Sequence, residues 1–250
     1  MTGVLRFIPM LLGVLFLAGS AQAADDLEVR ALLVPAQEAV LSSRIDGCIV
    51  RLPVEEGDRF QRNQDLVEFD CTILKAELDK ARMDLEAAVE THEAQLRLQK
   101  FGSTSELEVA VASAKRKRAA AEVLLMETKV GMCVIVAPFS GRVIKRRAHP
   151  FENVRPDDPI LEILDDTQLK LHLLVPSRWL RWLQAGQGFV VRVDETGRKY
   201  TATVTGLGAR VNPVNQTLEV EAAIAGSHAE LLAGMSGTAF FAPPPGEGSR

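Results

Sequence analysis

Three cysteines are the side chains best able to do chemistry in this 250-residue sequence. Cys71 and Cys133 lie at the two ends of a long segment without proline, and the midpoint between them is residue 102. If that segment forms two helices that reverse direction at 102, the two cysteines meet at the base of the pair. They can then form a disulfide in an oxidising compartment, and the alternative is two buried thiols. Cys48 has no partner in this scheme, and we expect it to be buried in a strand.

Other reactive side chains are scattered along the chain. The sequence contains no CxxC, HxxxH or GxSxG pattern and no phosphate-binding loop. We therefore predict no catalytic residues, no metal site and no cofactor. The net charge of −4 argues against nucleic acid as a partner, and the basic run 115–118 is expected to be a solvated helix face.

The N-terminus has the pattern of an export signal. Arg6 precedes twelve residues, 7–18, that are mostly apolar, and small residues follow up to Ala23. A segment of this length is too short to span a bilayer, which needs about 20 residues. The pattern predicts a cleavable signal peptide over 1–23, with cleavage between Ala23 and Ala24. An uncleaved anchor is the alternative.

The segment 71–133 predicts an antiparallel coiled-coil hairpin. Gly102 can end the first helix, and Ser105 with Glu108 forms a capping box that can start the second. Apolar positions recur at alternating intervals of four and three residues, which favours helices that pack along one stripe each. The first expected stripe is Leu74, Leu78, Ala81, Leu85, Ala88 or Val89, His92 and Leu96. The second, interrupted by Arg118, is Leu107, Val111, Ala114, Ala121, Leu125 and Thr128.

Strand signals occupy both sides of the hairpin. Residues 43–70 and 137–164 align without a gap at an offset of 94 residues, so that Gly47 matches Gly141 and apolar positions match apolar positions. Two similar halves predict one β domain, formed by 43–70 and 134–166 and split by the hairpin. Short strands then predict a β-barrel over 167–242, after an N-terminal strand region at 24–42 and before a disordered tail at 243–250. The fold class is thus α+β.

These motifs resemble a known family. Gly47 with the run Val54-Glu55-Glu56-Gly57-Asp58 is similar to the first half-motif of lipoyl-like (barrel-sandwich hybrid) domains, and the run 137–143 is similar to the second. Their order around a hairpin resembles the membrane fusion proteins, the periplasmic adaptors of tripartite efflux and export systems of the resistance-nodulation-division or hemolysin-secretion type. In carrier domains of this kind a modified lysine lies on the turn between the two halves. Here the hairpin occupies that place, so we expect no carrier function.

The resemblance implies a non-enzymatic protein of the periplasm, peripheral to the inner membrane. Such a protein links an inner-membrane transporter to an outer-membrane channel and assembles as a homo-oligomeric ring. In the family a tip motif of Arg, Leu and Ser contacts the channel. The nearest match here is Arg97, Phe101 and Ser105, in which Phe replaces Leu and the last interval is shorter. Ser105 has an alternative role as the helix cap.

Two other functions fit the same residues. One is an adaptor of an ATP-driven or type I secretion system. The other is a stand-alone periplasmic structural or binding protein that shares the architecture.

Overall fold

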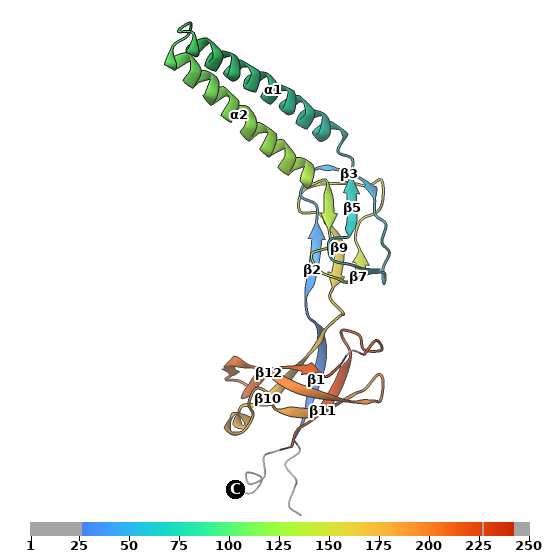
Figure 1. Cartoon of the computed structure of the whole chain (residues 1–250). Coiled ribbons are helices and arrows are strands. Elements are labelled where there is room, and N and C mark those ends of the chain that lie inside the picture. The colour runs from blue at the N-terminus through green and yellow to red at the C-terminus, as the bar shows by residue number, and fades with distance from the viewer. Residues whose placement is uncertain (1–26, 227, 243–250) are drawn as a thin grey trace, which may run out of the picture.

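The computed structural model describes residues 27–226 and 228–242. The expected signal peptide, its cleavage point between Ala23 and Ala24, and the expected tail at 243–250 lie outside these residues. The described chain is elongated and has three parts in a row (Figure 1): a helical hairpin, a β domain with two sheets, and a β-barrel.

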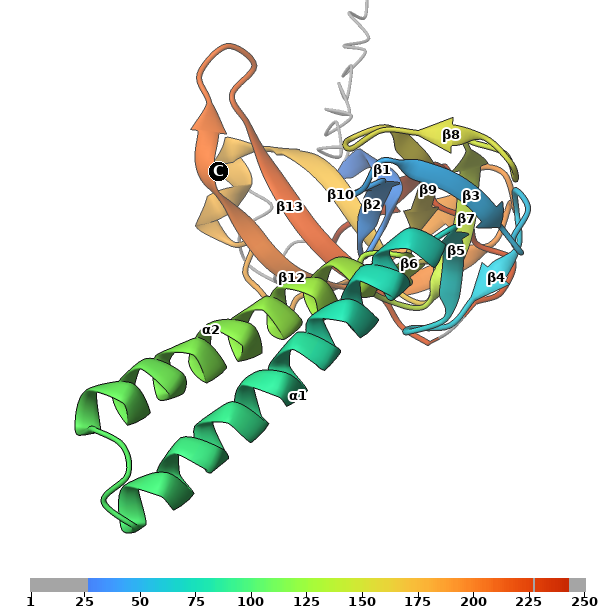
Figure 2. The same ribbon diagram turned by 90° about the horizontal axis from the view of Figure 1, so that it is seen from above.

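Two helices form the hairpin: α1 (Thr72–Lys100) and α2 (Glu106–Gly131). They lie side by side and antiparallel (Figures 1 and 2), and Arg82 on α1 forms an ion pair of 3.0 Å with Glu127 on α2. The predicted capping box is present at the start of α2. At 1.5 Å per residue, each helix extends about 40 Å from the β domain.

Only one of the two expected stripes faces the other helix. On α1 the expected positions Leu78 and Ala81 are buried. On α2 the expectation was wrong, because every one of its positions is exposed: Leu107, Val111, Ala114, Ala121, Leu125 and Thr128. The covered face of α2 consists of Val109, Ala112, Arg116, Ala119, Val123, Met126 and Val130. Both faces of α2 carry small or apolar residues at helical spacing, so periodicity alone does not select the face that meets α1.

Two four-stranded antiparallel sheets form the β domain next to the hairpin. In one sheet the order is β2 (Glu38–Ser42), β9 (Pro159–Leu164), β7 (Gly141–Arg146) and β4 (Arg59–Phe60). In the other it is β6 (Val134–Val136), β5 (Asp65–Phe69), β3 (Gly47–Arg51) and β8 (Asn153–Val154). Each sheet takes strands from both sides of the hairpin, so this domain is split by it; we call it the split β domain. A single core of apolar side chains lies between the sheets.

The repeat at an offset of 94 residues is visible in the main chain. Gly57 N–H donates to the carbonyl oxygen of Val143 at 2.9 Å, and the equivalent Phe151 N–H donates to the carbonyl oxygen of Ile49 at 2.7 Å. Gly57 and Phe151 both have positive φ angles, +89° and +68°. The two halves are therefore related by an approximate twofold axis.

Six strands close the barrel, in the order β1 (Glu28–Pro35), β10 (Leu169–Pro176), β13 (Thr217–Ile224), β12 (Lys199–Asn212), β11 (Gly188–Val193) and β14 (Ser236–Phe240). A short 3₁₀ helix, η1 (Ser177–Arg181), places Trp179 against Trp182 and Phe241, at ring-centroid distances of 5.2 and 5.3 Å. The barrel differs from the expected span 167–242, because β1 from the N-terminal strand region pairs with both β10 and β14. A barrel closes only when its last two edges pair, and β1 provides that pairing. The second strand of the same region, β2, joins the split β domain instead.

Candidate partner-binding site at the hairpin tip

The hairpin tip exposes a large aromatic side chain far from the rest of the molecule. Phe101 follows the last residue of α1 and is 82% exposed. Gly102 comes next with a φ of +68°, a left-handed conformation that glycine adopts without strain. The chain thus turns sharply after Phe101, and the ring of Phe101 lies outside the helical pair.

Hydrogen bonds order the loop that follows. The Thr104 hydroxyl lies 2.7 Å from Gln95 Oε1 on α1 and 2.6 Å from Glu108 Oε2 on α2. The hydroxyl of Thr104 and then the N–H and hydroxyl of Ser105 hold the pKa of the Glu108 carboxyl below its usual value. The loop is therefore tied to both helices, which fixes the position from which Phe101 projects.

The three residues expected at this site have different environments. Arg97 lies one helical turn before Phe101, is largely exposed, and forms a loose ion pair of 3.8 Å with Glu93. Ser105 lies across the loop, where its hydroxyl accepts a hydrogen bond from Glu108 N–H at 3.2 Å as the N-cap of α2. Arg97 and Phe101 are thus free to meet a partner, whereas Ser105 already serves the helix. A contact between any of the three and a channel stays a prediction.

The sequence reasoning missed Leu107. Its side chain, in the first turn of α2, is 73% exposed at the same end of the hairpin as Phe101. The heptad pattern had assigned Leu107 to the stripe between the helices. An exposed apolar residue on each arm makes the tip a small hydrophobic surface edged by Arg97 and Lys100, which are both in the last turn of α1.

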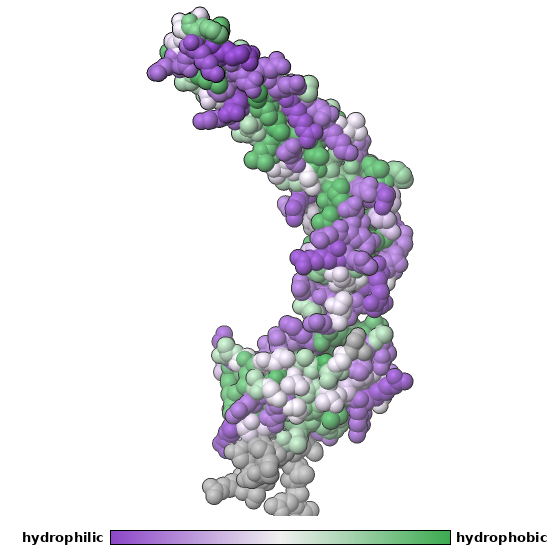
Figure 3. All heavy atoms as spheres, viewed as in Figure 1, coloured by the Kyte–Doolittle hydropathy of each residue, from purple (hydrophilic) through white to green (hydrophobic). Residues whose placement is uncertain are grey.

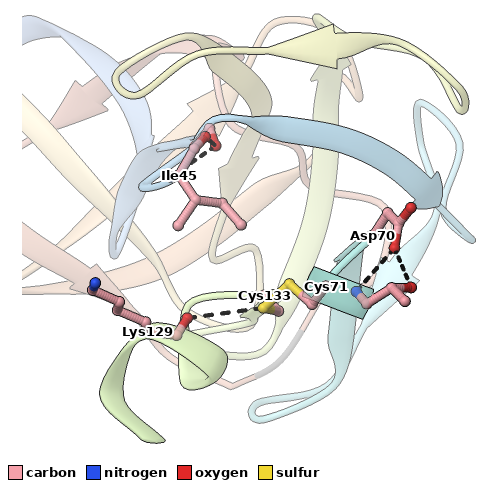
Figure 4. The surroundings of a disulfide bond; sticks show 7 residues. Ile45, Asp70, Cys71, Lys129 and Cys133 are labelled. Atoms are coloured by element: carbon pink, nitrogen blue, oxygen red, sulfur yellow. Dashed lines mark hydrogen bonds between the residues drawn. A yellow bond between two sulfur atoms is a disulfide. The ribbon is translucent and has the colours of Figure 1, made fainter. Parts of the chain in front are cut away.

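A disulfide closes the base of the hairpin. Cys71 and Cys133 are joined, with their Cα atoms 6.1 Å apart, as the reversal at residue 102 predicted. Figure 4 shows the bond between the start of α1 and the end of α2, with Asp70 accepting hydrogen bonds from the Thr72 N–H and hydroxyl. The bond from the Thr72 hydroxyl, and to a smaller extent the bond from the Thr72 N–H, hold the pKa of Asp70 below its usual value. Cys48 lies in β3 as a free thiol, and it is half-buried where burial was expected.

The described part of the chain offers little else for chemistry. Within residues 27–226 and 228–242, no group of three or more His, Cys, Asp or Glu side chains is arranged to hold a metal ion. In the same part of the chain, neither helix is apolar enough along its length to cross a membrane.

Solved structures share this arrangement. The chain aligns with the membrane fusion protein Spr0693 from Streptococcus pneumoniae R6 with a TM-score of 0.74, at 15% identity over 87% of this chain and 100% of that one. It aligns with a MacA–MexA chimera that carries the α-hairpin domain of Pseudomonas aeruginosa MexA with a TM-score of 0.75, at 16% identity over 85% and 78% of the two chains. A putative efflux transporter from Bacteroides eggerthii aligns with a TM-score of 0.71, at 20% identity over 85% and 67%. The fold is that of the membrane fusion proteins.

Sequence comparison finds distant relatives. The nodulation protein NolF of Rhizobium meliloti is 23% identical over 227 residues, which is 85% of this chain and 62% of NolF. An uncharacterized protein of Haemophilus influenzae is 25% identical over 194 residues, 76% of this chain and 50% of that protein. The chain thus spans only half to three-fifths of the length of these relatives. No protein-family model matches the sequence.

Proposed function

We propose that this protein is a periplasmic adaptor that links an inner-membrane transporter to an outer-membrane channel for the efflux of small molecules. The observation that carries the proposal is a rigid helical hairpin with an exposed aromatic tip, which projects from a split β domain next to a barrel. Membrane fusion proteins share this fold. In this role the hairpin would reach from the β domain towards the outer membrane, and its tip would contact the channel.

The parts of the molecule suit a scaffold. We infer that α1 and α2 form a coiled coil, supported by covered residues at intervals of three and four on both helices and by the disulfide at their base. The split β domain is lipoyl-like in its internal twofold, with the hairpin where a carrier lysine would stand. The protein would therefore act by binding, without turnover and without a cofactor.

The remaining contacts follow from the same arrangement. The barrel, at the opposite end from the tip, would face the transporter near the inner membrane (Figure 1). Copies would assemble side by side as a homo-oligomeric ring around the exported substrate. The predicted signal peptide over 1–23 would direct the chain to the periplasm.

Crosslinking in cells tests the adaptor role. A photo-reactive amino acid is placed at residue 101, with the barrel position Val214, which is also exposed, as the matched control. We expect an outer-membrane channel to be captured from 101 and not from 214. Capture of no membrane protein from 101, with efflux intact after deletion of the gene, would favour a stand-alone periplasmic protein.

The energy source of the system needs a second experiment. Co-purification of the full chain after mild crosslinking would identify the inner-membrane partner. A proton-driven transporter supports the main proposal, and an ATP-binding transporter supports a type I secretion or ATP-driven export system.

A further inference from the structure

A cleft lies where the two connections between the split β domain and the barrel come together. The connections are residues 36–37, between β1 and β2, and residues 165–168, between β9 and β10. They bond to each other, since Asp165 N–H donates to the carbonyl oxygen of Gln37 at 2.8 Å. The molecule is narrow and concave at this junction (Figure 3). The cleft has a volume of about 560 Å³, which is in the range of small-molecule sites.

The barrel gives the cleft apolar walls. Leu169, Ile224 and Leu231 line it, and Leu231 is buried. Gly206 of β12 lies beside them, at a point where the pairing of β12 with β13 shifts register. A β-carbon added to Gly206 would meet no atom within 4 Å. The missing side chain at Gly206 therefore leaves the cleft open.

The charged groups on the barrel side of the cleft already have partners. Glu221 lies 3.7 Å from the ammonium group of Lys170, so the two charges offset each other. The ring of His228 lies with Nε2 2.9 Å from the carbonyl oxygen of Ala225. A ligand would thus find its polar anchor on the other side, at the connection into β10.

Asp166 provides a buried carboxylate on that side of the cleft. Its side chain is only 4% exposed, and its Oδ2 accepts hydrogen bonds from Arg59 and Arg142. Its Oδ1 is buried and has no hydrogen-bond partner within the described residues. A buried polar atom left without a partner costs free energy, and such atoms are uncommon in native proteins. The cleft offers far more room than the single water that one hydrogen bond would need.

We propose that this cleft binds a small, largely apolar molecule whose hydroxyl or amide N–H donates a hydrogen bond to Asp166 Oδ1. A donor is required because a carboxylate oxygen can only accept. The donor is neutral, because two guanidinium groups already face this one carboxylate and would repel a cation. An anion would bring no proton to Oδ1. The apolar walls formed by the barrel then cover the rest of the molecule. Binding at this cleft is independent of the adaptor role.

Calorimetric titration of the chain from Ala24 onward tests the site with three six-carbon probes. These are 1-hexanol, hexylammonium and hexanoate, which share an apolar tail and differ in the head group. We expect 1-hexanol to bind at least about tenfold more tightly than either ion, because only its head group is both neutral and a donor.

Three variants locate the bound probe. Asp166→Asn exchanges the acceptor for a donor: the two arginines need the amide oxygen, so the amide nitrogen takes the place of Oδ1. The preference for 1-hexanol over hexanoate should then fall at least about tenfold. Gly206→Leu fills the cleft and should abolish binding of 1-hexanol. Gly188→Leu on β11 is the matched control, since its β-carbon also has room, with the nearest atom at 4.0 Å. Binding should persist in this control, and circular dichroism checks that all variants fold.

Each other outcome counts against the proposal. Binding of no probe to the wild-type chain would show that the cleft holds only water. Binding that survives Gly206→Leu would place the probe elsewhere, and a preference for either ion would contradict a neutral donor. If Asp166→Asn does not fold, the order of the three probes and the Gly206→Leu variant still decide. Crosslinking from residue 101 reports on the adaptor role alone, so the two proposals can fail separately.

Discussion

Gly57 and Phe151 occupy equivalent positions in the two halves of the split β domain, and the backbone of both has a positive, left-handed φ angle. In each half the turn is capped by the carboxylate of the next residue, Asp58 or Glu152, which accepts a main-chain N–H at 2.9 Å. Glycine adopts this backbone freely, whereas an L-residue with a β-carbon does so at a cost of about 1–2 kcal/mol. The phenyl ring of Phe151 is 81% exposed, so burial offsets little of that strain.

The first prediction concerns this strain. Phe151→Gly should raise the free energy of unfolding by about 1 kcal/mol, because relief of the left-handed strain exceeds the added backbone entropy of the unfolded chain. The matched variant Gly57→Ala should lower it by about 1 kcal/mol, since a β-carbon there meets open space and only the backbone is strained. Urea denaturation measures both. Equal stability of the Phe151→Gly variant and the wild type would contradict the argument.

The same comparison shows what the sequence could predict. The split β domain could be predicted from the sequence because Gly47 and Gly141 start equivalent strands with matching apolar positions. At Gly141 the constraint is severe, since an added β-carbon would lie 1.9 Å from the carbonyl oxygen of Leu164. Nothing in the residue type of Phe151 indicated a positive φ. That feature is seen only when its position is matched to Gly57.

Two other features depend on tertiary partners. The stripe from Leu107 to Thr128 has the spacing of a helix contact, but α1 covers the opposite face of α2, which includes Arg116. The pattern was correct about the spacing and wrong about the face of α2 that meets α1. At the tip, the exposure of Phe101 followed from the turn at Gly102. The role of β1 in the barrel could not be predicted in this way, because its partner strand β10 lies more than 130 residues later in the sequence.

The second prediction concerns the disulfide. Replacing Cys71 and Cys133 together with alanine should lower the free energy of unfolding by about 4 kcal/mol, because the bond closes a loop of about 60 residues in the unfolded chain. Urea denaturation measures the loss, and Cys48→Ala is the matched control with a small effect. Thiol titration in denaturant without reductant should detect one thiol, and after reduction three. Three thiols before reduction would refute the pairing.

The third prediction concerns pH at the hairpin tip. The pKa of Glu108 is lowered in the folded state, so its contribution to the start of α2 is fully present above the ordinary carboxyl value, near 4.5. This contribution is lost as pH falls through the lowered pKa. Amide hydrogen exchange in the first turn of α2 should therefore accelerate below about pH 4.5 beyond the intrinsic trend.

Two variants separate the charge from the cap. Glu108→Gln keeps the capping hydrogen bonds without a titrating group and should remove the pH dependence. Ser105→Ala should lower helix stability at neutral pH by about 1 kcal/mol. A pH dependence that persists in Glu108→Gln would assign it to another group.

The fourth prediction concerns the junction between the split β domain and the barrel. Asp166 lies between β9 and β10, and its side chain is only 4% exposed. Its Oδ2 accepts hydrogen bonds from Arg59 Nη2 at 3.0 Å and Arg142 Nε at 3.2 Å. Asp166→Ala would leave two facing guanidinium groups without their shared carboxylate. We expect a loss of about 2 kcal/mol, less than for a fully buried pair because Arg59 is largely exposed.

A surface pair on the barrel provides the control. Asp194 accepts a hydrogen bond from Arg30 at 2.8 Å, and the side chains are 66% exposed for Arg30 and 40% for Asp194, against 4% for Asp166. Asp194→Ala should therefore lower the free energy of unfolding by less than about 1 kcal/mol. Since Asp166 anchors the connection into the barrel to β4 and β7, its removal should also raise hydrogen exchange in residues 165–168 while the barrel strands stay protected. Equal losses from the two substitutions, with unchanged exchange at the junction, would show that Asp166 is an ordinary surface partner and does not fix the connection between the two domains.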